Sequence, residues 1–231
     1  MKSSLSNNVQ KVVSISTDKV VDPANLMGLT KAIQEKVFSS IALQKGRRRT
    51  SFVNVRFGNV TGTHGSLFPI IYHQITTGRP ITVTHPEMTR FFISSSEAID
   101  LIFWGAINGN DGEIIIKKMK STPIVNVAQQ FLSILKVDKK NPIKYIGIRA
   151  GEKMHESLIT EDNLFRTKEK SGYYIIAPYK SGESVVLSSR KPKFVREQFL
   201  SQNPKNFLGD RELRDYIKEY LLEHKLRNYI I

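Results

Sequence analysis

Cysteine is absent from this 231-residue chain, so neither a disulfide framework nor thiolate chemistry is available to it. Long apolar runs are missing as well, and the sequence therefore offers no segment able to cross a bilayer. The first eight residues are mostly polar and lack the apolar stretch of a signal peptide. Together these absences predict a protein of the reducing cytoplasm.

Acidic residues are few relative to basic ones: 21 Asp and Glu against 35 Lys and Arg give a net charge of +14. Such an excess suits either nucleic acid binding or attraction of an anionic ligand such as a sugar-nucleotide diphosphate. The basic clusters at 47–49 and 190–193 show no helical stripe with interleaved aromatics, and Pro192 disfavours a helix in the second. A solvated basic surface is the preferred interpretation.

Apolar periodicity alternates between strand and helix patterns. It predicts strands at 9–15, 51–56, 80–83, 90–93, 113–117 and 144–148, and helices at 25–44, 66–77, 97–108 and 125–135. Such alternation favours βαβ units and a largely parallel sheet. The polar, basic and poorly periodic stretch 180–206 is expected to form a tail or a long loop.

Apolar faces are recognisable on several of the predicted helices. In the helix 25–44 this face consists of Ile33, Val37 and Ile41. A last helix is predicted with Asp210 as its cap and with an apolar face of Leu213, Tyr216, Ile217, Tyr220 and Leu221. The apolar face of this last helix must pack against the rest of this chain or against a partner.

Side chains suited to chemistry follow the first predicted strand. The apolar run Val12–Ile15 leads into Ser16-Thr17-Asp18-Lys19. Ligands of open α/β sheets bind outside the carboxyl ends of the strands, where a hydroxyl, a carboxylate and an ammonium can divide acid, base and orienting roles. Taken alone, the tetrapeptide also suits an ordinary helix-entry turn with Asp18 as a cap.

Further motifs follow in a characteristic order. They are Met27-Gly28-Leu29-Thr30-Lys31, Arg56-Phe57-Gly58-Asn59-Val60, Gly65-Ser66, Met88-Thr89-Arg90-Phe91 and the block from Gly147 to Glu156. From about residue 8 to about residue 180 the chain resembles the extended short-chain dehydrogenase/reductase superfamily. Within it, the chain looks most like the UDP-N-acetylglucosamine 4,6-dehydratases (inverting) of the polysaccharide biosynthesis protein family.

The resemblance implies an α/β fold: a partial Rossmann-like, doubly wound parallel sheet with a smaller α/β substrate domain. It implies the C-terminal part of an NAD(P)-binding domain at 1–64, a nucleotide-sugar-binding region at 65–180 that can return strands to the sheet, and a basic tail with a terminal helix at 181–231. No glycine-rich strand-turn-helix precedes Val9. We therefore expect the back part of a dehydratase, with most of the NAD or NADP site absent from the chain.

The chemistry implied by the resemblance is oxidation of sugar carbon 4, loss of water across carbons 5 and 6, and return of the hydride to carbon 6. Asp18 then fits the acid for the departing hydroxyl, and Lys19 the base at carbon 5. Thr17 would bond the oxygen on carbon 4. Lys31 would hold the nicotinamide ribose, although a solvated helix lysine is the ordinary alternative.

Met27 departs from the superfamily pattern Tyr-x-x-x-Lys, in which its position is a tyrosine. A thioether has no proton to exchange and cannot replace a tyrosinate. Some dehydratases of this group carry methionine there, so Met27 is expected beside the cofactor. Simple packing of Met27 is the alternative, and the group that replaces the tyrosine base is left open.

The resemblance also assigns contacts with the sugar nucleotide, to Asn59, Thr82, Arg90, Arg149 and Glu152, while Val60 would face the cofactor. Arginine suits a diphosphate because its planar fork matches phosphate oxygens, but solvated arginines are the alternative. His64, His85 and His155 lack the spacing of metal ligands, and no metal is expected.

The sequence therefore predicts an NAD- or NADP-dependent lyase that acts on a UDP-sugar in the synthesis of capsule or other surface polysaccharide. A homo-oligomer or a complementing N-terminal chain is a possible partner. One alternative is an inactive truncated fragment or a half that needs a partner chain. A basic nucleic-acid-binding module is the less favoured alternative, because the motifs would then be coincidental.

Overall fold

The computed structural model describes residues 1–137, 143–178 and 199–224, so most of the predicted loop at 180–206 lies outside the described residues. The chain forms two compact units. The first comprises Met1–Phe57, Glu97–Lys118 and Ser157–Phe199, and the second comprises Gly58–Ser96, Met119–Glu156 and Leu200–Ile231. These units are defined by contacts, and the functional division expected at 1–64, 65–180 and 181–231 stays a prediction.

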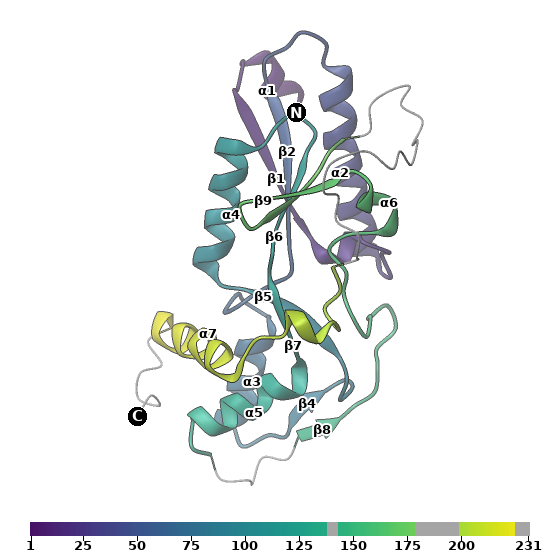
Figure 1. Cartoon of the computed structure of the whole chain (residues 1–231). Coiled ribbons are helices and arrows are strands. Elements are labelled where there is room, and N and C mark those ends of the chain that lie inside the picture. The colour runs from purple at the N-terminus through teal and green to yellow at the C-terminus, as the bar shows by residue number, and fades with distance from the viewer. Residues whose placement is uncertain (138–142, 179–198, 225–231) are drawn as a thin grey trace. The chain divides into compact units, whose positions relative to one another are not determined.

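The first unit contains a five-stranded sheet in the order β1 (Lys11–Thr17), β2 (Ser51–Phe57), β6 (Ile114–Lys117), β10 (Tyr173–Ile176) and β9 (Thr167–Lys170). β1, β2 and β6 are parallel, whereas β10 runs antiparallel to both β6 and β9 (Figure 1). The predicted α/β fold with a parallel sheet is confirmed. The antiparallel hairpin β9–β10 was not predicted.

Helices cover both faces of this sheet, as in a doubly wound fold. α2 (Leu26–Gln44) contacts one face, where Phe38 packs edge-on against Phe52 with ring centroids 5.7 Å apart. α4 (Ser95–Asn108) covers the other face, because Gly105 lies against Val55. The first unit also contains the short helices α1 (Lys2–Ser6), η1 (Asp18–Val20) and α6 (Glu161–Leu164).

The predicted inner face of α2 is wrong. Ile33 and Val37 are 62% and 40% exposed, while Gly28, Glu35 and Phe38 are the buried residues of the helix. The reason is the polarity of the sheet surface below, where the buried side chains include Ser14, Asn54 and Arg56. Such a surface accommodates Glu35, and apolar periodicity alone cannot reveal this.

The second unit is built on a three-stranded sheet in the order β3 (Asn59–Val60), β5 (Thr89–Ile93) and β7 (Lys120–Pro123). β3 and β5 are parallel, and β5 and β7 are antiparallel. β4 (Ile81–Val83) pairs in parallel with β8 (Ile143–Tyr145). The helices of this unit are α3 (Leu67–Thr76), α5 (Ile124–Ile134), η2 (Pro204–Asn206) and α7 (Asp210–Glu223).

The apolar face predicted for the last helix is confirmed, and it packs within the second unit. Leu213, Ile217, Tyr220 and Leu221 of α7 are buried in a core with residues of α3 and α5. Burial raises the pKa of the Tyr220 hydroxyl to about 12. The predicted cap is wrong by one residue: Gly209 is the N-cap, and its N–H donates to Glu212 Oε2 at 3.0 Å, while Asp210 begins the helix.

None of the helices in the described ranges has both the length and the apolar character that a membrane-spanning segment needs.

Candidate active site

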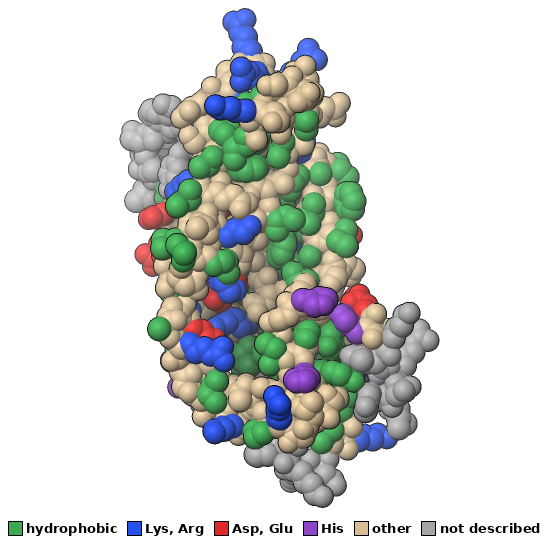
Figure 2. All heavy atoms as spheres, turned by 180° about the vertical axis from the view of Figure 1, so that it is seen from behind, with side chains coloured by type: hydrophobic (Ala, Val, Ile, Leu, Met, Phe, Trp, Pro, Cys, Tyr) green, Lys and Arg blue, Asp and Glu red, His purple; other side chains and the backbone are tan. Residues whose placement is uncertain are grey.

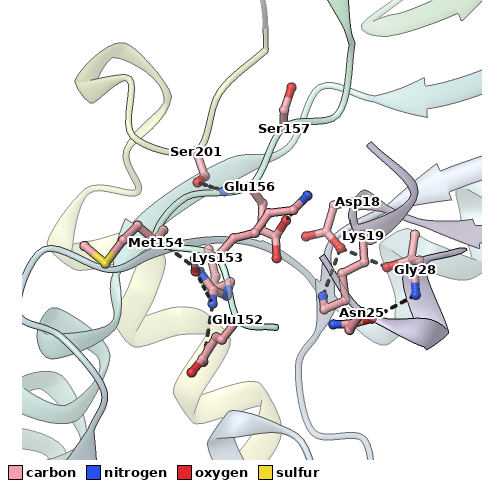
Figure 3. Close-up of polar contacts among 12 residues, drawn as sticks. Asp18, Lys19, Asn25, Gly28, Glu152, Lys153, Met154, Glu156, Ser157 and Ser201 are labelled. Atoms are coloured by element: carbon pink, nitrogen blue, oxygen red, sulfur yellow. Dashed lines mark hydrogen bonds and ion pairs between the residues drawn. The ribbon is translucent and has the colours of Figure 1, made fainter. Parts of the chain in front are cut away.

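The segment predicted to carry the chemistry lies where β1 passes into η1 in the first unit. Thr17 ends the strand and Asp18, which is fully buried, begins η1. Asp18 Oδ1 accepts a hydrogen bond from Thr17 Oγ1 at 2.8 Å and another from Lys19 Nζ at 3.0 Å. Figure 3 shows Lys19 beside Asp18. Hydroxyl, carboxylate and ammonium are thus in direct contact.

The second carboxylate oxygen of Asp18 lacks such hydrogen bonds. Asp18 Oδ2 is buried and has no hydrogen-bond partner among the described residues. A buried polar atom left without a partner costs about 1–3 kcal/mol, and more for a charged group. Lys19 exposes 28% of its side chain to solvent, whereas Asp18 is fully buried. Asp18 Oδ2 therefore retains hydrogen-bonding capacity that the described residues do not use.

Lys31 and Met27 lie on the first two turns of α2. Lys31 Nζ donates to the carbonyl oxygen of Ile15 at 3.0 Å and to Gln34 Oε1 at 3.1 Å. One of its three N–H groups therefore has no partner within the described part of the chain, which fits a contact with a ribose hydroxyl. The side chain of Met27 is 48% exposed.

Two residues that support this segment were not predicted. Asn25 caps α2, because its Oδ1 accepts from the backbone N–H of Gly28 at 2.9 Å. A Cβ on Gly28 would lie 2.4 Å from the carbonyl oxygen of Lys19, so only glycine allows this approach (Figure 3). A glycine inside a helical pattern signals a special packing requirement, but the sequence does not reveal the partner.

Three residues predicted to bind ligands lie on two strands of the second unit. Asn59 and Val60 form β3, and Asn59 Oδ1 is a buried atom without a partner among the described residues. Thr82 lies in β4, and its Oγ1 accepts from Gln74 Nε2 at 2.8 Å. The hydroxyl of Thr82 thus connects β4 to α3, whereas Asn59 Oδ1 has no hydrogen-bond partner among the described residues.

Arg90 is buried in β5 and bonds the segment 152–154 of the same unit. Its guanidinium donates to the carbonyl oxygens of Thr89 and Lys153, both at 2.8 Å, and of Met154 at 3.2 Å. Glu152 Oε1 lies 3.5 Å from it. Glu152, Lys153 and Met154 are drawn in Figure 3. Arg90 therefore holds a loop as well as offering a positive charge.

Arg149 contrasts with Arg90 because it is exposed in the loop that follows β8. Its backbone N–H lies 3.5 Å from Glu152 Oε2, so the structure brings these two predicted residues together. An exposed arginine at this position is accessible to an anionic ligand.

His155 makes a structural contact. Its Nδ1 lies 2.8 Å from Thr89 Oγ1, which in turn is 2.8 Å from Ser201 Oγ. Burial, and then the positive charge of Arg90, lower the pKa of His155 below its ordinary value. No group of three or more metal-binding side chains occurs among the residues that the structure describes.

Basic side chains are visible at several places on the face shown in Figure 2, some of them beside acidic ones.

Comparison with known proteins identifies the class. The family model described as "Polysaccharide biosynthesis protein" matches residues 1–178. An uncharacterized membrane protein of Methanocaldococcus jannaschii is 37% identical over 203 residues, which cover 84% of this chain and 61% of that protein. The UDP-glucose 4-epimerase of Rickettsia typhi is 36% identical over 176 residues, which cover 76% of this chain and 51% of the epimerase.

Solved structures share the fold of this chain. Pen from Bacillus thuringiensis superposes with a TM-score of 0.81 and 29% identity, covering 94% of this chain and 65% of that one. The dTDP-glucose 4,6-dehydratase of Bacillus anthracis, solved with NAD, has a TM-score of 0.57 and 16% identity over 65% of this chain and 54% of that one. The second likeness concerns the fold alone.

The chain thus spans between about half and two thirds of the length of these relatives. The match of the family model over residues 1–178 includes the five-stranded sheet of the first unit and the loop that contains Arg149 and Glu152. The chain belongs to the polysaccharide biosynthesis protein family.

Proposed function

We propose that this chain carries the catalytic segment and the sugar-nucleotide region of a UDP-N-acetylglucosamine 4,6-dehydratase that inverts carbon 5. The observation that supports this best is the state of Asp18. One of its carboxylate oxygens is held by Thr17 and Lys19, and the other is buried without a partner among the described residues. That arrangement suits proton delivery to a sugar hydroxyl.

The elimination needs an acid and a base, and adjacent residues can supply both. A proton of the Lys19 ammonium first passes to Asp18, whose Oδ1 lies 3.0 Å from Nζ. The neutral amine of Lys19 then takes the proton from carbon 5, which the neighbouring ketone acidifies. Asp18 gives its proton to the hydroxyl on carbon 6, which leaves as water. Thr17 Oγ1, whose O–H donates to Asp18, accepts a hydrogen bond from the hydroxyl on carbon 4. When bound, NAD or NADP supplies the oxidation at carbon 4 and the hydride that returns to carbon 6.

Lys31 and the second group of residues hold the ligands in this proposal. The remaining N–H of Lys31 bonds a hydroxyl of the nicotinamide ribose, near Met27 of the same helix. Val60 is a separate cofactor contact in the proposal. The exposed guanidinium of Arg149 pairs with the diphosphate, and Asn59 bonds the sugar nucleotide through its unpartnered oxygen. Arg90 and Glu152 shape the loop that carries these contacts.

A second candidate function is 4-epimerisation, because relatives that are 36% identical are named UDP-glucose 4-epimerase. Epimerisation inverts carbon 4 and keeps the hydroxyl on carbon 6, so it needs no acid aimed at that hydroxyl. The placement of Asp18 between Thr17 and Lys19 favours dehydration.

The product distinguishes the two reactions. The test uses the chain itself, and also a fusion of this chain with the part of Bacillus thuringiensis Pen that it does not cover. Each is incubated with NAD and UDP-N-acetylglucosamine in D2O, and the sugar is examined by NMR and mass spectrometry. We expect from the fusion a 4-keto-6-deoxy sugar with deuterium at carbon 5. A sugar inverted at carbon 4 that retains its oxygen on carbon 6 would refute the dehydratase proposal.

A further inference from the structure

A glutamine that no sequence motif indicates lies one helical turn after Lys31. Gln34 is half-buried on α2, and residues three apart on a helix share a face. Its Oε1 accepts from Lys31 Nζ at 3.1 Å. Its Nε2 donates to the carbonyl oxygen of Ile15 at 3.2 Å and also to Ser14 Oγ. The carboxamide therefore links the lysine on α2 to the strand β1.

The two ends of the carboxamide have opposite tasks. An ammonium group needs an acceptor, whereas the carbonyl oxygen of Ile15 needs a donor, and a primary amide offers both. Lys31 Nζ and Gln34 Nε2 donate to the same carbonyl oxygen, so the three groups form a closed triangle of hydrogen bonds. Within this triangle the ammonium has a fixed place, although lysine is a flexible side chain with much rotamer freedom.

We infer that Gln34 is a positioning residue, which holds the ammonium of Lys31 against β1 so that its third N–H is directed at a ligand hydroxyl. The positioning itself follows from contacts within the first unit. Only the identity of the ligand, a nicotinamide ribose, rests on the proposed function. Gln34 itself touches neither substrate nor cofactor in this scheme.

The arrangement distinguishes substitutions of similar size. Gln34→Met keeps the length of the side chain but removes both the acceptor and the donor. Gln34→Glu keeps the acceptor for Lys31 and loses the donor to Ile15. A residue that merely fills space would tolerate methionine better than a charged carboxylate, whereas a residue that holds the ammonium would tolerate glutamate better.

The test observes the ammonium group directly. In ¹⁵N-labelled chain, a lysine NH3⁺ signal is visible when its protons exchange slowly with water, and Lys31→Arg assigns the signal of Lys31. We expect Gln34→Met to abolish this signal and Gln34→Glu to retain it. Gln44→Met is the matched control, because Gln44 lies on the same helix, is exposed and bonds only Ser40 Oγ at 3.0 Å among the described residues.

Retention of the Lys31 signal at the parental exchange rate in a folded Gln34→Met chain would overturn the inference. Gln34→Ala serves in the same comparison if the methionine variant does not fold, and near-UV circular dichroism establishes folding. In the fusion with the relative's additional segment, Gln34→Met should raise the KM for NAD about tenfold with a smaller change in kcat, because a misplaced ligand contact weakens binding.

The NMR measurement tests the positioning role of Gln34, and the kinetics of the fusion test the proposed ligand and function. A lost signal with an unchanged KM for NAD would refute the cofactor as the ligand of Lys31. A parental fusion that binds NAD but converts no UDP-sugar would count against the proposed function, while the NMR result alone would still decide the role of Gln34.

Discussion

Two ion pairs of the first unit illustrate the difference between a structural contact and a site prepared for a ligand. Arg56 Nε and Nη2 donate to the two oxygens of Glu35 at 3.0 and 2.6 Å, and Arg56 Nη1 donates to the carbonyl oxygen of Leu158 at 2.6 Å. Both side chains are buried. Asp18 is equally buried, yet its Oδ2 has no hydrogen-bond partner among the described residues. Lys19, which forms an ion pair with Oδ1, is partly exposed.

The two ion pairs differ in whether contacts within the chain satisfy the carboxylate. The Glu35–Arg56 pair is satisfied within the chain, and it connects α2, β2 and the residues that precede α6. The Asp18–Lys19 pair is incomplete, and a bound hydroxyl would complete it. Burial of the carboxylate does not separate the two pairs. The exposure of the cation and the number of satisfied carboxylate oxygens do.

The largest effect is expected from breaking the satisfied pair. Arg56→Met leaves Glu35 buried without its cation, so it should lower the free energy of unfolding by about 3–5 kcal/mol. Urea denaturation followed by circular dichroism measures this loss. The double variant Glu35→Met/Arg56→Met should recover a substantial part of it. A loss below about 1 kcal/mol in the single variant would show that the pair is not structural.

Two arginines of the second unit allow a similar comparison, between a residue that binds a ligand and a residue that stabilises the fold. Arg149 is exposed, so Arg149→Ala should leave the melting temperature unchanged and weaken the binding of UDP by roughly 10–100-fold, the value of a charged hydrogen bond of about 1.5–3 kcal/mol. Isothermal titration calorimetry measures the affinity.

Arg79→Ala is the control for this measurement, because Arg79 is exposed in the same unit and belongs to no predicted site. Arg90→Ala should lower the melting temperature as well as the affinity, since Arg90 bonds the carbonyl oxygens of the loop. Equal UDP affinities in the Arg149→Ala, Arg79→Ala and parental chains would rule out Arg149 as the diphosphate contact.

Gly28 tests how closely α2 must approach the incomplete pair. A methyl group at this position would lie 2.4 Å from the carbonyl oxygen of Lys19, so Gly28→Ala should destabilise the chain by about 1–3 kcal/mol and displace Lys19. Leu29→Ala, which alters an exposed neighbour, should have a much smaller effect. The NMR shifts of Lys19 and Asp18 report the displacement, and unaltered shifts in Gly28→Ala would contradict it.

The sequence predicted those features that depend on neighbouring residues. The contact of Thr17, Asp18 and Lys19 is local. The helix predicted over 25–44 is found at Leu26–Gln44, where its own sequence supplies the Asn25 cap. The pair Glu35–Arg56 joins residues on different elements and could not be predicted in this way.

The features that were missed have physical reasons. The inner face of α2 was predicted wrongly because the sheet surface beneath it is polar. The strand β9 escaped detection since three of its four residues, Lys168, Glu169 and Lys170, are exposed and charged. The roles of Gly28 and Gln34 depend on the position of β1 and η1 against α2, which no periodicity reveals.

A small effect on stability is expected at the incomplete pair. Asp18→Asn keeps the shape and an acceptor for Thr17 and Lys19, so it should change the free energy of unfolding by about 1 kcal/mol or less. Urea denaturation, as for Arg56→Met, provides the comparison. A loss as large as that of Arg56→Met would mean that Asp18 is a structural residue and that the two pairs do not differ.

The measurement that tests the account most directly is exchange of the proton on carbon 5 in the fusion with the relative's additional segment. With UDP-N-acetylglucosamine and NAD in D2O, the parental fusion should incorporate deuterium at carbon 5. Lys19→Ala should abolish this incorporation, because it removes the base, whereas Met27→Leu, which removes only the thioether, should retain most of it. Incorporation by Lys19→Ala at the parental rate would contradict the assignment of Lys19 as the base and the dehydratase proposal with it.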